Sequence, residues 1–164
     1  MVEDLILKAE AVCHACGGIC CNGACPPLSE ERIRIILSYG DFHERIEKVG
    51  YHRIKGGKDG LCSMLSEGKC AIHAFKPETC IAGPFTFDLT DHSLRIFLKQ
   101  EKICPLVAVL KANRAMYDLQ FGRAVESIAH LVARLLDDEL AIISALPEPD
   151  TDQVAELPLP EKAL

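Results

Sequence analysis

Cysteine is the residue type with the clearest chemical potential in this sequence, which carries nine of them in 164 residues. Four lie close together as Cys13, Cys16, Cys20 and Cys21. The CxxC spacing of Cys13 and Cys16 lets two thiolates face one metal ion while backbone N–H groups donate to the sulfurs. Adjacent cysteines seldom bind one ion together, so the last pair indicates a centre with more than one metal atom or two neighbouring sites.

The other cysteines are too far apart in the sequence to form a metal site locally, so the tertiary structure has to bring them together. One of them, Cys104, precedes Pro105 at the start of a predicted helix, where free N–H groups and the helix dipole favour thiolate over thiol. Cys25 is left outside the ligand set as an accessory thiol. The predicted metal ligands are Cys13, Cys16, Cys20, Cys21, Cys62, Cys70, Cys80 and Cys104.

Four runs in order, CHACGGICC, DGLCSML, GKCAIH and KPETC, make the sequence resemble a family of cysteine-cluster proteins, the CxxCxxCC or YkgJ type, described as zinc- or iron-chelating domains. The pattern spans about residues 13–85. The resemblance implies metal chelation by the seven cysteines from Cys13 to Cys80 named above, with Cys104 as an eighth ligand. Some larger relatives couple such a domain to protein methylation, which this chain is too short to repeat in full.

The thiols allow two other interpretations. Free cysteines often behave as small buried hydrophobes. The segment around the first cluster, however, is rich in glycine and proline and offers few apolar side chains against which four thiols could be buried. A dithiol redox pair at Cys13 and Cys16 would require a preceding strand and a following helix. His14 and His73 lie beside ligand cysteines in sequence, although a solvated imidazole is the more common arrangement.

The thiolates suit either iron, including a 4Fe–4S cluster, or Zn²⁺. The sequence favours iron slightly and predicts an accessory, redox or sensing role. The alternative is a zinc-stabilised module that binds a partner protein through its helical region without catalysis. A methyltransferase-like enzyme is a third hypothesis. No catalytic triad, carboxylate pair or cofactor loop selects a reaction, so a non-enzymatic role is favoured.

Composition excludes several classes of partner. The formal net charge of -6 opposes binding to a phosphate backbone, so nucleic acid is not expected. The best apolar run, residues 140–146, is far too short to cross a membrane. The acidic start MVEDLILK is unlike a secretory signal, and clustered thiols in a reducing compartment are usually ligands, so we expect a cytoplasmic protein.

The first half of the chain contains the less regular elements. Apolar spacing predicts a helix over 3–12, followed by an irregular loop over 13–28. Ser29 is a good N-cap for a helix to about residue 39, and a second short helix is predicted over 41–49. Residues 51–60 are predicted as an exposed loop, and 61–73 as two short segments around a turn. Pro77 predicts a helical turn that carries Cys80.

The second half contains the clearest periodicities. Residues 84–89 and 93–99 alternate apolar and polar side chains around TDHS, which predicts a β-hairpin. Residues 105–146 are predicted as a helical hairpin or a broken helix with a bend at 120–122. The expected fold is α+β and mainly helical, as one metal-binding domain over 1–146, with its metal-binding region at 13–104 and its helical region at 105–146. Residues 147–164 are expected to be a flexible, proline-rich tail.

Overall fold

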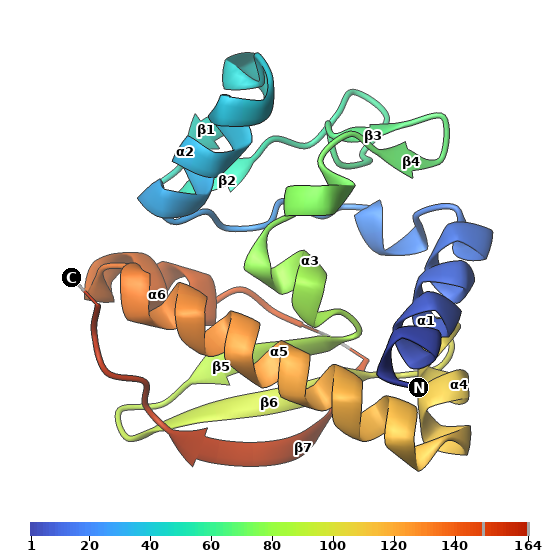
Figure 1. Ribbon diagram of the computed structural model, residues 1–164. Coiled ribbons are helices and arrows are strands. Elements are labelled where there is room, and N and C mark those ends of the chain that lie inside the picture. The colour runs from blue at the N-terminus through green and yellow to red at the C-terminus, as the bar shows by residue number, and fades with distance from the viewer. Residues whose placement is uncertain (149, 164) are drawn as a thin grey trace.

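A computed structural model of the chain describes residues 1–148 and 150–163. The fold is α+β and mainly helical, as the sequence predicts. Buried apolar side chains form two clusters, one within residues 21–75 and one that draws mainly on residues 82–157. We call residues 19–76 the cysteine lobe and residues 83–163 the sheet lobe. Figure 1 shows the two lobes one above the other, with α3 (Glu78–Ala82) between them and α1 (Val2–Cys16) alongside.

The cysteine lobe is built from short elements around a small core of Leu28, Ile36, Ile54, Met64 and Ile72. Its longest helix begins as predicted, because the Ser29 side chain accepts a hydrogen bond from the backbone N–H of Arg32 at 3.1 Å. The elements are η1 (Ile19–Cys21), α2 (Glu30–Tyr39), η2 (His43–Arg45), β1 (Ile46–Lys48), β2 (His52–Ile54), β3 (Leu65–Ser66), β4 (Lys69–Cys70) and η3 (His73–Phe75).

Two sequence predictions for this lobe are wrong. The helix expected over 41–49 is the single turn η2 followed by strand β1, and the loop expected over 51–60 contains its partner strand β2. The two strands pair antiparallel with Ile46 opposite Ile54. Ile54 is fully buried in the lobe core, so tertiary burial, rather than local periodicity, decides the structure here.

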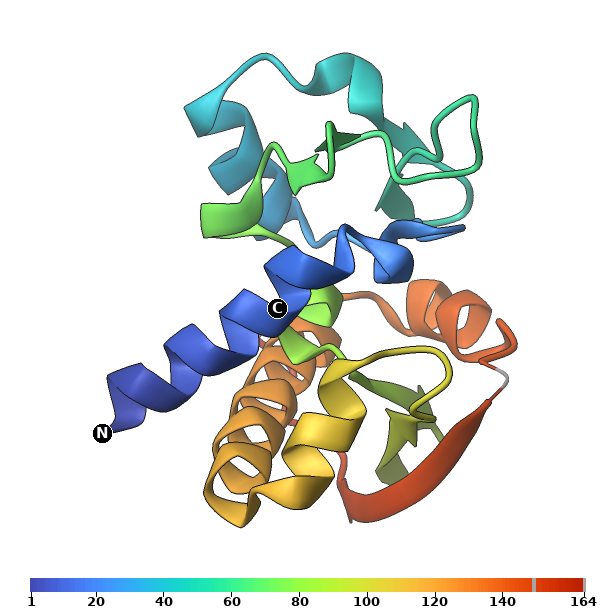
Figure 2. The ribbon, with the colours of Figure 1, turned by 90° about the vertical axis from the view of Figure 1, so that its right-hand side faces the viewer.

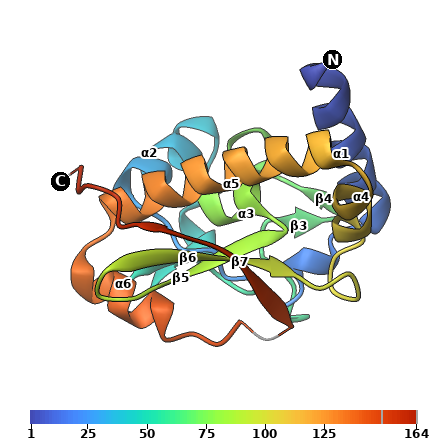
Figure 3. The ribbon, with the colours of Figure 1, turned by 90° about the horizontal axis from the view of Figure 1, so that it is seen from below.

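The predicted hairpin of the sheet lobe is confirmed as β5 (Phe85–Leu89) and β6 (Ser93–Lys99), paired antiparallel. A third strand, β7 (Thr151–Pro158), pairs antiparallel with the other edge of β6, as Figure 3 shows from below. The expected flexible tail over 147–164 is therefore wrong for residues 151–158. The backbone groups of a free sheet edge give a proline-poor stretch of the tail a place to pair, which its own composition does not reveal.

Three helices follow the hairpin: α4 (Leu106–Ala112), α5 (Arg114–Arg134) and α6 (Asp137–Ser144). The break lies at Asn113, whose side-chain Oδ1 accepts from the backbone N–H of Met116 at 3.1 Å and so caps α5. The bend predicted at 120–122 is wrong, because α5 continues through it. Gln120 there turns inward, where its Nε2 donates to the carbonyl oxygens of Ile81 at 3.0 Å and Gly83 at 2.7 Å.

Candidate metal centre

The first two cysteines lie on the last turn of α1. The helix extends to Cys16, so the irregular loop expected from residue 13 starts four residues later, and Gly17 ends the helix with a φ of 68°. Residues three apart share a helix face, so Cys13 and Cys16 point to the same side. The segment from Cys13 to Cys16 is therefore helical rather than an irregular loop.

The first group of thiols, which we call the first set, consists of Cys13, Cys16, Cys20 and Cys104. The four line one small cavity of about 40 Å³ together with Val12, Ile103, Pro105 and Leu106. Burial raises the pKa of the Cys13 thiol, and the neighbouring Cys104, Cys20 and Cys16 raise it further. Cys104 is 84 residues beyond Cys20 in the sequence, so the fold brings it to the cluster.

Cys104 stands at the start of α4, as the sequence predicts for a helix that begins near Pro105. Its carbonyl oxygen accepts from the backbone N–H of Val107 at 3.1 Å. Burial raises the pKa of its thiol, and a hydrogen bond from the backbone N–H of Leu106 opposes that rise. The helix start thus offers a backbone donor to a sulfur at this position.

The remaining predicted ligands, which we call the second set, are Cys21, Cys62, Cys70 and Cys80. The backbone N–H of Cys62 donates to the carbonyl of Cys21 at 2.8 Å, and Cys70 lies on β4 opposite Leu65 of β3. Cys21, Cys62 and Cys70 all belong to the core of the cysteine lobe. Cys80 is exposed at the surface, but desolvation by surrounding protein atoms raises the pKa of its thiol, and the charge of Cys62 adds to the effect.

The adjacent pair Cys20 and Cys21 connects the two sets. A hydrogen bond from the Cys21 thiol lowers the pKa of Cys20 to about 6, and the same bond raises the pKa of Cys21. Gly18, just before this pair, lets the backbone pass close to the Leu65 side chain. Its φ is 91°, and an added Cβ would lie 3.1 Å from a methyl carbon of Leu65. Cys20 lines the first cavity, whereas Cys21 packs in the cysteine-lobe core.

No three Cys, His, Asp or Glu side chains within residues 1–148 and 150–163 already stand in metal-binding geometry. The four thiols of the first set line one cavity, and the thiols of the second set lie near enough for the charges of Cys62 and Cys70 to raise the pKa of Cys80.

Two lysines that sequence reasoning missed lie beside the thiols. Lys76 lowers the thiol pKa of Cys13, Cys20 and Cys80, and Lys99 does so for Cys20 and Cys104, although burial or the Cys21 bond is the larger influence in each case. Their positive charges face an assembly that becomes strongly negative when the thiols ionise. The position of Lys76 beside Pro77 in the run KPETC is the only sequence signal that could have identified it.

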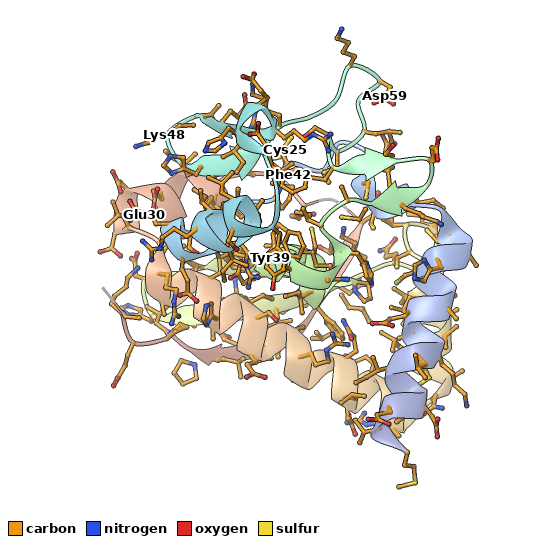
Figure 4. The ribbon with its side chains drawn as sticks, turned by 45° about the horizontal axis from the view of Figure 1, so that its top comes forward. Cys25, Glu30, Tyr39, Phe42, Lys48 and Asp59 are labelled. Atoms are coloured by element: carbon orange, nitrogen blue, oxygen red, sulfur yellow. The ribbon has the colours of Figure 1, made fainter. Side chains whose placement is uncertain are left out.

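The remaining thiol and the two histidines lie beside these sets. The rings of His14 and His73 are 5.6 Å apart between centroids, so α1 and η3 meet there. Cys25 is not a predicted ligand but lies beside the second set: a Cβ added to Gly56, which forms a β-bridge with Cys62, would stand 3.7 Å from its sulfur, and its charge raises the pKa of Cys62. Figure 4 shows Cys25 on the cysteine lobe.

Comparison with known proteins gives one match. The model of a family described as "CxxCxxCC: Putative zinc- or iron-chelating domain" matches residues 12–105. No curated protein and no solved structure matches the chain. The matched segment includes all eight cysteines of the first and second sets. Among the residues that the structure describes, no helix combines the length and apolarity needed to span a membrane.

Proposed function

The chain belongs to the CxxCxxCC family, and we propose that it binds two metal centres, one through the four thiolates of the first set and one through those of the second. The observation that carries this proposal is the division at Cys20 and Cys21. One of these adjacent cysteines lines the first cavity and the other packs beside Cys62 and Cys70. The hydrogen bond between their thiols keeps the two sulfurs adjacent, so the two centres would lie next to each other.

Zn²⁺ suits this arrangement best. Four thiolates complete a closed tetrahedral zinc site, and such a site contributes directly to folding. The function that follows is a zinc-chelating protein in which the metal stabilises the cysteine lobe, whose own apolar core is small.

Charge does not decide between the metals. A Zn²⁺ ion with four thiolates carries two net negative charges, and an oxidised iron–sulfur cluster with four thiolates carries the same. Lys76 and Lys99 oppose that charge equally well in either case.

An iron–sulfur protein with a redox or sensing role is the second candidate. Cys104 is followed by Pro105, a step also found in ligand runs of bacterial ferredoxins, and the first cavity is partly open to solvent through exposed Cys13 and Cys20. An oxidised cluster there would be accessible to an electron-transfer partner.

The test is metal and acid-labile sulfide analysis of protein purified without oxygen. We expect about two zinc ions per chain, no sulfide and a colourless protein. Stoichiometric iron with sulfide would replace the zinc proposal by the second candidate. A fully reduced, folded chain that binds neither metal would overturn both.

Single substitutions test the division into sets. Cys16→Ser should remove about one metal equivalent, Cys70→Ser should remove the other, and Cys25→Ser, the matched control, should retain both. Loss of all metal from both of the first two variants would indicate one shared centre instead.

A further inference from the structure

The second set lies on elements that the fold already holds in place. Cys62 is buried with 8% of its surface exposed, and its backbone is tied to Cys21. Cys80 lies on α3, which is fixed at both ends. Near its start the Glu78 carboxylate accepts two hydrogen bonds from Arg32, and at its end the Gln120 amide donates to two carbonyls. These hydrogen bonds tie the backbone around Cys62 and Cys80 to the neighbouring elements.

The first set, by contrast, depends on a loosely attached helix. None of the residues of α1 is buried, and the helix start has no side-chain cap. Only Leu5, Ala9 and Val12 contact the main core, and those contacts are partial. Figure 2 shows the N-terminal end of α1 reaching beyond the rest of the molecule. A helix of 15 residues is marginally stable by itself in water, so α1 belongs to the least stable part of the fold.

The thiols of the first set are also more exposed to solvent than those of the second set. Cys13 and Cys20 are exposed, and the cavity that they share with Cys16 and Cys104 is partly open. An acceptor ligand can therefore approach an ion in the first set. In the second set, Cys62 is buried, Cys21 and Cys70 are half-buried against the core of the cysteine lobe, and only Cys80 is exposed.

From these differences, and resting on the proposed function, we propose that the first set is an exchangeable zinc site and the second a permanent one. Zinc then passes between the chain and an acceptor that carries thiolate or imidazole ligands. One Zn–S bond breaks for each bond that forms between zinc and the acceptor. The ion keeps its double positive charge throughout, and each released thiolate of α1 takes up a proton from water.

The test uses the full-length zinc-loaded chain and the chromogenic chelator 4-(2-pyridylazo)resorcinol. We expect two kinetic phases of about one equivalent each, with the fast phase at least about tenfold quicker. Cys104→Ser should remove the fast phase and leave the slow one, while Cys25→Ser keeps both. A single phase of two equivalents, or loss of the fast phase in Cys70→Ser instead, would overturn the proposal.

A second variant leaves every ligand in place. Ala11 is exposed on α1, and Ala11→Gly should weaken that helix and speed the fast phase about fivefold without changing the slow one. Glu126→Gly also introduces a glycine at an exposed helical position, but on α5, which carries no ligand. It should alter neither phase. Equal effects of the two glycines would contradict a role for α1 in zinc release.

The two proposals fail in different ways. A chain that carries no zinc before the chelator is added contradicts the proposed function. A chain that carries two zinc ions but releases them in one phase keeps that function and contradicts only the exchangeable first set.

Discussion

One carboxylate oxygen of Glu78 accepts two hydrogen bonds from Arg32, from Nε at 3.1 Å and from Nη2 at 3.0 Å. Glu78 is 2% exposed and Arg32 14%, so the pair is almost wholly withdrawn from water. His130 of α5 approaches the same oxygen at 3.9 Å. The Arg32–Glu78 pair therefore joins α2 of the cysteine lobe to α3, and His130 extends this connection to α5.

Removing the charge of Glu78 should destabilise the protein strongly. Glu78→Gln leaves the buried Arg32 guanidinium without its counter-charge, and we expect the free energy of unfolding to fall by about 3 kcal/mol. Urea unfolding of the zinc-loaded protein measures this. Glu47→Gln is the control: Glu47 accepts from Arg53 at 2.9 Å in a half-exposed pair, where the loss should stay under about 1 kcal/mol. Equal losses in the two variants would show that burial of the Arg32 pair contributes nothing.

The amide of Gln120 should hold the end of α3 that follows Cys80. Gln120→Leu leaves the carbonyls of Ile81 and Gly83 buried without their donor, which should cost about 2 kcal/mol of unfolding free energy. Because Cys80 shares this helix, the slow release of zinc should also quicken. The control Gln153→Leu, at an exposed position of β7, should change stability by no more than about 0.5 kcal/mol. An unchanged slow phase in Gln120→Leu would separate Gln120 from the positioning of Cys80.

The low pKa of Cys20 predicts a pH-dependent reactivity in the metal-free, reduced protein. Since a thiol is deprotonated above its pKa, Cys20 should be mostly thiolate at pH 7, and its alkylation by iodoacetamide should decline as the pH falls through about 6. Cys104, whose pKa is raised by burial, should react little at pH 7. Mass spectrometry after short pulses of reagent locates the labelled residue.

A substitution at the neighbouring position tests the cause. Cys21→Ala removes the thiol that donates to Cys20, so the midpoint of Cys20 alkylation should rise toward the ordinary value of about 8.5. An unchanged midpoint in this variant would exclude the Cys21 hydrogen bond as the origin of the low pKa.

Strand β7 should contribute to stability through its inward-facing residues. Ala155 lies opposite Ile96 and packs against the main core, whereas Val154 beside it is 38% exposed. Ala155→Asp places a carboxylate against apolar side chains and should cost about 2 kcal/mol, while Val154→Asp should change stability by about 0.5 kcal/mol or less. Thermal unfolding of both variants checks the difference. Equal and small effects would mean that residues 151–158 leave the sheet in solution.

Local sequence patterns were sufficient to predict the features that depend on neighbouring residues. The cap at Ser29, the hairpin of β5 and β6, and the helical turn after Pro77 all follow from local patterns, and the structure confirms them. The thiol chemistry follows in the same way, because residue type and spacing identify cysteines suited to a metal, and the family match agrees.

The grouping of the thiols, in contrast, depends on contacts between distant parts of the chain. Nothing in the local pattern places Cys104 beside Cys13, or turns Cys20 and Cys21 toward different neighbours, because both relations come from packing between distant segments. The same holds for β1, β2 and β7, which are strands because each found a partner edge and a core to cover. Short-range periodicity reports the backbone that a segment prefers, whereas burial and pairing across the chain determine which side chains share a centre.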